Sequence, residues 1–310
     1  MKINKPYALN ETGRRQNQED SIFPAKEQAD SSTHLFLVCD GMGGHENGEV
    51  ASQTVCESFA LFLKDVDPES FSEAIFEQAL AYTYGELDKK DNLPESKSKM
   101  GTTLTLLHLS QKEAFMAHIG DSRIYHLRTS GGKAEIIYKT SDHSLVNELL
   151  RADMITEEEA ENHPKKNVIT RAVQPNMEKR CKADVHRTTD VKAGDYFFLC
   201  SDGVVESLSD NKLIEILSQN IGDDEKIKEI YQLCNAHSSD NFSAYLIPVT
   251  EGIAETAELA TTSAEMDADV TAPPIIRKGR WKVILWIVVL VIIGVGAYFF
   301  MKCGGLEVKN

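Results

Sequence analysis

Closely spaced cysteines are missing from this sequence. Its six cysteines are scattered over 310 residues and form no CxxC pair. A disulfide framework is therefore not expected, and we expect buried, reduced thiols in a cytosolic domain. The first residues, MKINKPYALNETG, also lack an apolar run, so we expect no secretory signal peptide.

Basic residues are scarce before Arg277. The segment that precedes this residue has 27 basic and 47 acidic residues, a net charge of −20, within a formal charge of −15 for the whole chain. Such a surface repels phosphate backbones, so nucleic acid is not an expected partner. We expect part of this acidic charge to converge on a cation instead.

Long apolar runs are also scarce, and the longest lies near the end of the chain. Residues 283–301 read VILWIVVLVIIGVGAYFFM, nineteen residues without a charge. At about 1.5 Å per residue, a helix of this length crosses roughly 30 Å of hydrocarbon. The alternative is a buried core helix, but such a helix rarely lacks charge on every face. We therefore predict one C-terminal transmembrane helix at 283–301.

The sequence on either side of this run predicts its orientation. Residues 277–310 comprise a basic flank with four Lys and Arg at 277–282, the predicted helix, and a short tail with two lysines. This bias places the residues before the helix in the cytoplasm. Residues 250–276 are rich in Ala, Thr and acids, which is typical of a flexible linker. We expect a single-pass protein of the inner (cytoplasmic) membrane.

Residues 1–249 are predicted to form one domain of strands and helices. Strand-like runs, rich in β-branched and aromatic residues, lie at 34–40, 102–109, 113–120, 122–128, 134–140, 195–201 and 242–249. Helical patterns cover roughly 48–64, 70–89, 210–219 and 223–236. Hairpins between helix pairs favour an α+β layered domain over alternating βαβ units. The polar segment 144–182 is predicted to be an excursion from this core.

Several acidic residues stand beside predicted strands or near the start of the chain. They are Asp20 with Glu19, Asp40, Asp121, Asp202, and Asp240 with Asn241. A single Asp-Gly after a strand usually marks a turn. Carboxylates that emerge together at the ends of adjacent strands, however, repel one another unless a cation neutralises them. The whole set therefore indicates a cation site.

The type of donor atom indicates which cation this site prefers. Oxygen ligands without a His/Cys cluster suit Mg²⁺ or Mn²⁺ rather than zinc. The glycines beside Asp40 let the backbone approach an ion and offer it a carbonyl oxygen. A bridging aspartate holds two ions about 3.5–4 Å apart, where they polarise a phosphoryl oxygen and acidify a shared water.

Eight motifs, in this order, resemble those of the PPM family, the type 2C protein serine/threonine phosphatases. They are GRRQNQED, VCDGMGGHENGEVAS, MGTTLTLL, AHIGDSRIYHLR, TSDHSLVNELL, NVITRAV, GDYFFLCSDGV and SSDNFSAYLI, and they span about residues 7–248. The resemblance implies a four-layer α-β-β-α sandwich, in which two antiparallel sheets pack together with helices outside. It places a metal centre at one end of the sandwich.

The resemblance also implies the ligands of two tightly bound ions. Asp40 matches the aspartate that bridges both ions, and Gly41 matches the carbonyl ligand of one of them. Asp202 and Asp240 match further ligands of one ion. Asp20 matches a ligand of the other ion, with Glu19 supporting its waters and Asn241 standing next to Asp240 in a supporting place.

Two further positions have roles that the resemblance implies. With Asp202, Asp121 matches the ligand pair of a third, weaker ion, and a hairpin turn paired with Arg123 is the alternative. Arg15 matches the arginine that grips the substrate phosphate, which suits its bidentate guanidinium. A surface charge, or a salt bridge to Glu19, is the alternative for Arg15.

Two positions depart from the family pattern. Met42 stands where eukaryotic members have the histidine proposed as general acid, and a thioether cannot donate a proton. Water, His45 or His143 must then protonate the leaving group. In ITRAV, Val173 and Gln174 replace the common Leu-Gly, which leaves the local conformation of the polar excursion open.

The resemblance predicts hydrolysis of phosphoserine and phosphothreonine in proteins by a metal-bridging hydroxide, with Mn²⁺ or Mg²⁺ and without a covalent phosphoenzyme. The expected partners are substrates of a Ser/Thr kinase. The alternative is a catalytically weak signalling module of the same fold that binds phosphoproteins. Such modules usually lose metal ligands, and this sequence retains every expected aspartate.

Overall fold

The computed structural model describes residues 1–43, 47–91 and 100–254. The predicted basic flank, the transmembrane helix at 283–301 and most of the linker lie outside these residues. Within the described ranges, no helix is both long enough and apolar enough to cross a membrane. All of the described residues fall in one compact unit.

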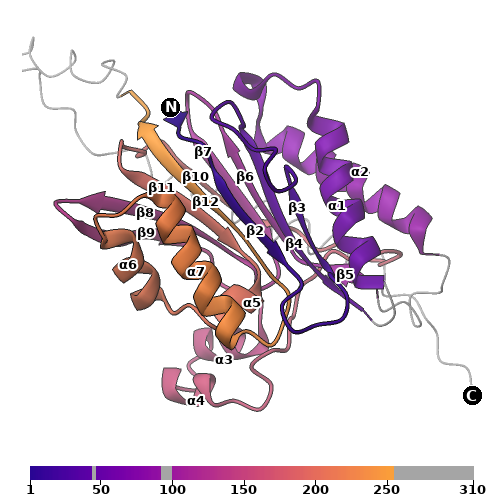
Figure 1. The fold of residues 1–310 in the computed structure, drawn as a ribbon. Coiled ribbons are helices and arrows are strands. Elements are labelled where there is room, and N and C mark those ends of the chain that lie inside the picture. Colours follow the sequence, from indigo (N-terminus) through magenta and orange to yellow (C-terminus); the bar gives the residue numbers. More distant parts are fainter. Residues whose placement is uncertain (44–46, 92–99, 255–310) are drawn as a thin grey trace, which may run out of the picture. The chain divides into compact units, whose positions relative to one another are not determined.

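Two six-stranded antiparallel sheets form the centre of this unit (Figure 1). The first, called here the β12 sheet, has the order β1-β12-β11-β8-β9, and β2 also pairs with β12. Its strands are β1 (Lys2–Ile3), β2 (Tyr7–Glu11), β8 (Arg123–Ser130), β9 (Lys133–Lys139), β11 (Asp195–Cys200) and β12 (Phe242–Glu251).

The second sheet, called here the β4 sheet, has the order β10-β7-β6-β4-β3, and β5 also pairs with β4. Its strands are β3 (Asp20–Phe23), β4 (Leu35–Met42), β5 (Gly101–Thr102), β6 (Leu104–Leu109), β7 (Ala114–Ile119) and β10 (Asp184–Thr188). The chain passes from the β4 sheet to the β12 sheet between β7 and β8, at Gly120, Asp121 and Ser122.

Helices cover the outer faces of both sheets, as Figure 1 shows. Helices α1 (Asn47–Leu63) and α2 (Glu73–Lys90) pack on the β4 sheet, and α6 (Asp210–Ser218) and α7 (Asp223–His237) pack on the β12 sheet. Each helix pair shares an apolar core with its sheet, and a third apolar core lies between the sheets. The predicted four-layer sandwich is confirmed for the described residues.

Strand β4 shows how the sequence builds two of these cores. Leu35 and Leu37 belong to the core under α1 and α2, whereas Phe36 and Val38 belong to the core between the sheets. This alternation follows from the period of two in a β-strand. Asp40 continues the row of Phe36 and Val38, so its side chain extends the layer between the sheets.

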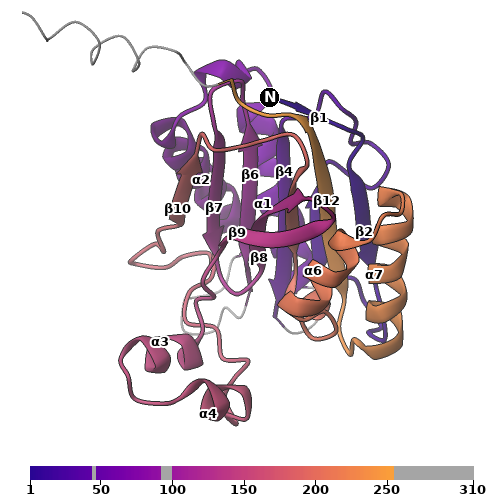
Figure 2. The same cartoon turned by 90° about the vertical axis from the view of Figure 1, so that its left-hand side faces the viewer.

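The excursion at 144–182, called here the flap, carries two short helices below the sandwich (Figure 2). Helix α3 (Leu145–Arg151) begins after the N-cap Ser144. Helix α4 (Glu157–Glu161) begins with a capping box in which Thr156 and Glu159 satisfy each other's backbone N–H groups. The flap returns to the sandwich through a bridge between Val173 and Thr102. Val173 is fully buried there, so the departure from the family pattern keeps this connection intact.

Several element boundaries differ from the sequence-based prediction. Strands β1, β2, β3 and β10 and the short helix α5 (Asp202–Val205) were not predicted, because they are short and carry polar residues on one face. Helix α2 begins at Glu73 rather than near Ser70, because Pro68–Ser70 forms a separate 3₁₀ turn and Ser72 caps the helix. Strand β12 continues to Glu251, two residues beyond the predicted end at 249.

Candidate metal centre

The predicted acidic residues meet at one end of the layer between the sheets. Asp20 and Asp40 lie directly opposite each other in the register of β3 and β4. Asp202 and Asp240 come from the other sheet, where they follow β11 and precede β12. The site is therefore built from two facing sheets, with adjacent strands of each sheet contributing to it. Ser201 joins the two halves, because its Oγ donates to Asp20 Oδ2 at 2.8 Å.

The backbone of Asp40 is held by Thr103. The Asp40 N–H donates to Thr103 Oγ1 at 2.9 Å, and the Thr103 N–H donates to the Asp40 carbonyl at 2.9 Å. Thr103 Oγ1 also lies 2.7 Å from Ser122 Oγ. Because Thr103 is fully buried, these bonds fix the end of β4 to the β7–β8 connection.

Gly41 occupies a position that accepts no side chain. Its N–H donates to the Glu19 carbonyl at 3.1 Å. A Cβ at Gly41 would lie 2.1 Å from the Gly48 carbonyl oxygen and 2.4 Å from the Glu19 carbonyl oxygen. A Cβ at Gly48 would lie 2.9 Å from both Glu19 Cδ and the Gly41 carbonyl oxygen. The Glu19 carboxyl and the Gly41 carbonyl thus both lie against Gly48, and this side-chain-free contact is called here the cradle.

Arg15 and Asn241 lie beside Asp240. Arg15 Nη2 donates to Asp240 Oδ2 at 2.5 Å, so the guanidinium pairs with Asp240 and the structure shows no salt bridge between the described Arg15 and Glu19 side chains. Asn241 Oδ1 accepts the Glu19 N–H at 2.8 Å, and Asn241 Nδ2 donates to the Thr12 carbonyl at 2.9 Å. Asn241 therefore fixes the loop that carries Arg15 and Glu19 against the start of β12.

The electrostatics of the centre favour a bound cation. Burial, and then the charges of Asp20 and Asp202, raise the pKa of Asp40 well above its usual range. Burial also raises the pKa of Asp20 to about 7, against the hydrogen bonds that Ser201 and Ser243 supply. The pKa of Asp202 is raised mainly by burial. A divalent cation would remove this cost by pairing with the ionised carboxylates.

Asp121 lies in the connection between β7 and β8. Its Oδ1 is buried and has no hydrogen-bond partner among the described residues. Burial, followed by the charges of Asp202 and Asp142, raises the pKa of Asp121 to about 7. Arg123 binds Asp142 with two hydrogen bonds of 2.8 and 2.7 Å, so its guanidinium is engaged there and not with Asp121. The unsatisfied oxygen fits a weakly held cation better than a turn paired with Arg123.

A cleft of about 1000 Å³ opens beside Asp121 and Asp202. Its opposite wall comes from the flap, including Asn147, Glu157 and Lys166. Residues of the flap therefore line the same cleft as Asp121 and Asp202.

The candidate general acids have different surroundings. Met42 stands at the end of β4, and its thioether has no proton to donate. His45 lies outside the described residues. His143 is 3% exposed, and both of its ring nitrogens face protein groups, Gly120 on one side and Asp184 on the other. His143 is therefore not free to serve as a general acid, whereas water and His45 remain candidates.

Cys181 and Arg187 have the Cys-x₅-Arg spacing that cysteine-dependent phosphatases use. Sequence reasoning missed this spacing, and the structure shows that it forms no phosphate-binding loop. Asp184–Thr188 is the extended strand β10, and Arg187 Nη2 pairs with Glu113 Oε2 at 2.8 Å. A cysteine nucleophile is excluded at this position.

Comparisons with known proteins show the family of this chain. The profile of the family described as Protein phosphatase 2C matches residues 12–241, which is most of the chain. The chain is 34% identical over 245 residues to the protein phosphatase PhpP of Streptococcus pneumoniae, a match that covers 78% of this chain and 96% of PhpP. The chain belongs to the protein phosphatase 2C family. It is a metal-dependent serine/threonine protein phosphatase.

Solved structures show the same fold. The crystal structure of the serine/threonine phosphatase PstP/Ppp of Mycobacterium tuberculosis is similar with a TM-score of 0.69 and 29% identity, and the match covers 81% of this chain and all of that chain. A structure of the catalytic domain of PstP in complex with two manganese ions is similar with a TM-score of 0.66, 29% identity and the same coverage.

Proposed function

We propose that this phosphatase hydrolyses phosphoserine and phosphothreonine in cytoplasmic proteins modified by a Ser/Thr kinase. In this proposal two Mn²⁺ or Mg²⁺ ions bind tightly at Asp40, Gly41, Asp20, Asp202 and Asp240, and a third binds weakly at Asp121 and Asp202. The observation that carries the proposal is the convergence of these carboxylates from both sheets around the side-chain-free cradle at Gly41.

Divalent ions at this centre would polarise the phosphoryl oxygen and lower the pKa of a bound water. The chain supplies the arrangement that this chemistry needs. Thr103 fixes the Asp40 backbone, and the Glu19 carboxyl lies beside the Gly41 carbonyl, where it would support the waters of an ion.

Arg15 is the group that binds the substrate phosphate in this proposal. Its side chain is 54% exposed and reaches the Asp240 carboxylate from the solvent side. A phosphate dianion would offer the guanidinium a stronger, bidentate partner than one carboxylate oxygen does. Arg15 can therefore turn from Asp240 to the substrate without crossing the protein interior.

The test of this function is hydrolysis of p-nitrophenyl phosphate and of a phosphothreonine peptide by protein dialysed against EDTA. We expect no turnover in excess EDTA, and full turnover after Mn²⁺ or Mg²⁺ is added. The Asp40→Asn variant serves as the matched control and should stay inactive with metal. Full activity in EDTA would contradict the metal mechanism, and peptide binding without turnover by the metal-loaded wild type would favour the alternative, a phosphoprotein-binding module.

We also propose that residues 283–301 anchor the phosphatase in the inner membrane, with the catalytic domain in the cytoplasm. The apolar run and the basic residues at 277–282 support this proposal. External protease should leave the catalytic domain of intact cells uncut, and its removal would refute the orientation. Phosphoproteomics of cells that lack the protein, against cells that carry Asp40→Asn, would identify the substrates.

A further inference from the structure

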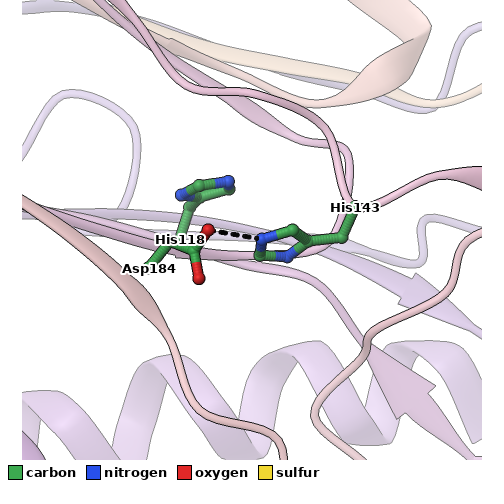
Figure 3. Close-up of side chains that lie close together, drawn as sticks. All are labelled: His118, His143 and Asp184. Atoms are coloured by element: carbon green, nitrogen blue, oxygen red, sulfur yellow. Dashed lines mark ion pairs between the residues drawn. The ribbon is translucent and has the colours of Figure 1, made fainter. Parts of the chain in front are cut away.

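His118, His143 and Asp184 lie close together at the edge of the β4 sheet, beside the start of the flap (Figure 3). The two imidazole rings are stacked, with centroids 4.5 Å apart and planes at 17°. One ligand atom from each of the three residues lies within 4.8 Å of the others. Such a cluster resembles a metal site, so its hydrogen bonds decide what it can bind.

The hydrogen bonds of His143 argue against a metal at this cluster. The Gly120 N–H donates to His143 Nδ1 at 3.1 Å, so Nδ1 carries the lone pair of the neutral ring. The proton is then on Nε2, which lies 3.2 Å from the acceptor Asp184 Oδ2 and 3.3 Å from Arg171 Nη1, itself a donor. No lone pair on Nε2 is left for an ion. Arg171 Nη1 also lies 2.8 Å from Asp184 Oδ1, so a cation already occupies the carboxylate.

The same bonds clamp the backbone of Gly120. The His143 N–H donates to the Gly120 carbonyl at 2.9 Å, while the Gly120 N–H donates to the His143 ring. Gly120 has φ +108°, and a Cβ there would lie 2.6 Å from Thr103 Cγ2. Thr103 in turn holds the Asp40 backbone. Gly120 is thus fixed between His143 on one side and the residue that anchors the metal centre on the other.

His143 also marks the point where the flap leaves and returns. The Thr170 N–H donates to the His143 carbonyl at 2.8 Å, and the neighbouring Leu145 N–H donates to the Val168 carbonyl at 2.9 Å. One residue therefore contacts the β7–β8 connection through its ring and both ends of the flap through its backbone.

We propose that His143 is a positioning residue, whose Nε2–H tautomer, oriented by Asp184 and Arg171, fixes the Gly120 backbone and so places the Asp121 carboxylate for the third ion. This inference rests on the third ion site of the proposed function. Asp121 follows Gly120 directly, so rotation of the Gly120 peptide would move the unsatisfied Asp121 oxygen relative to Asp202.

The surroundings keep His143 in the form that this role needs. Burial lowers the pKa of His143; its hydrogen bond with Asp184 opposes this shift, whereas the stacked His118 and the nearby Arg171 add to it. A neutral ring can accept the Gly120 N–H, whereas a protonated ring has a donor on both nitrogens.

Two substitutions distinguish the roles of the two ring nitrogens of His143. The Oδ1 of His143→Asn occupies the place of Nδ1 and can accept the Gly120 N–H, but this variant cannot reach Asp184. The longer His143→Gln reaches towards Asp184 and lacks an acceptor at the place of Nδ1. Both remove the imidazole ring, so a loss of stacking affects them alike, and thermal denaturation of both controls for folding.

Three measurements are compared in wild type, His143→Asn and His143→Gln: the Mn²⁺ concentration that gives half-maximal rate, the calorimetric affinity for the weakest Mn²⁺ ion, and the Gly120 amide resonance with Mg²⁺ bound. We expect the Asn variant to remain within about twofold of wild type, and the Gln variant to need about tenfold more Mn²⁺, the effect of losing about one hydrogen bond. The two tighter ions should bind in both variants.

Equal behaviour of the Asn and Gln variants would overturn the inference, as would a ¹⁵N spectrum of the wild type with the proton on His143 Nδ1. Asp121→Ala distinguishes this failure from a failure of the proposed third site. If Asp121→Ala does not change the Mn²⁺ dependence, the third site is absent. The Gly120 amide resonance then still shows whether His143 fixes this backbone. An unchanged resonance in the Gln variant would show that it does not.

Discussion

The apolar and acidic ends of the layer between the sheets are formed by the same strands. At one end Phe36 and Phe197 are fully buried and belong to the apolar core. At the other end Asp40 continues the row of Phe36, and Asp20 lies opposite it on β3, so the two carboxylates repel each other. The apolar end stabilises the fold, whereas the acidic end costs stability until a cation binds. The comparison teaches that one strand register determines both the core and the site.

The largest expected effect separates activity from stability at these two ends. Asp40→Asn removes the central carboxylate, so we expect kcat to fall by about 10³-fold or more, while the metal-free free energy of unfolding stays equal or rises. Phe36→Ala should instead lower the free energy of unfolding by about 3–5 kcal/mol. Steady-state kinetics and urea unfolding in EDTA measure the two quantities. A strongly destabilised Asp40→Asn protein would contradict the difference expected between the acidic and the apolar end.

The next effect concerns the cradle at Gly41. Gly41→Ala brings a methyl group to 2.1 Å from the Gly48 carbonyl oxygen, so the backbone must shift. We expect Mn²⁺ affinity to fall by about 100-fold, which corresponds to roughly 3 kcal/mol. Gly85→Ala is the matched control, because Gly85 lies within α2 and a Cβ there meets nothing within 4 Å. That control should raise stability by about 1 kcal/mol and leave Mn²⁺ binding unchanged. Equal Mn²⁺ affinity in Gly41→Ala would contradict the cradle.

The next prediction concerns Arg15, which lies beside the acidic end and is proposed to bind the substrate phosphate. If it binds the phosphate mainly in the ground state, Arg15→Ala should raise KM about tenfold or more and lower kcat less. Arg14→Ala is the control, since the exposed Arg14 donates to the Ala236 carbonyl at 2.6 Å and has no bond to a centre residue. An unchanged KM would return Arg15 to the surface-charge alternative.

The smallest effect is a dependence of stability on pH. Folding raises the pKa of Asp20 and of Asp121 to about 7, above the value of about 4 in an unfolded chain. The folded protein then binds more protons, so its stability is greatest below the unfolded pKa and is lost as the pH rises through 7. In EDTA we expect Tm to fall by several degrees between pH 6 and 8.5, since 1 kcal/mol shifts Tm by about 2–4 °C.

Two controls accompany this pH series. Asp121→Asn removes one of the carboxyl groups whose pKa is raised and should flatten the fall in Tm. Saturating Mn²⁺ should reverse the trend, because ions bind ionised carboxylates and so favour high pH. A fall in Tm of the same size in Asp121→Asn would show that other groups cause it.

Much of this architecture could be predicted from the sequence, and the reasons are local. The β4 sheet could be predicted where apolar runs are long, as in β4 and β6, and Asp40 was recognised because Gly41 and Gly43 follow it. Strand β3 escaped prediction because it has four residues, of which Asp20 and Ser21 are polar. Its pairing with β4 places Asp20 opposite Asp40, which depends on tertiary contacts that propensity does not contain.

The hydrogen-bond partners within the site could also not be predicted from the sequence. The link from Arg15 to Asp240 spans 225 residues, and that from Gly120 to the His143 ring spans 23. Nothing in the motif TSDHS shows which ring nitrogen of His143 accepts a hydrogen bond. These contacts follow from the meeting of two sheets and from the return of the flap.

The central claim is that the acidic end of the layer between the sheets is a metal centre organised by Asp40. Calorimetric titration of metal-free protein with Mn²⁺ tests it most directly, with wild type, Asp40→Asn and Asp121→Ala side by side. The account predicts two tight ions and one weak ion in wild type, loss of the tight ions in Asp40→Asn, and loss of the weak ion alone in Asp121→Ala. Tight binding of two ions by Asp40→Asn would contradict it.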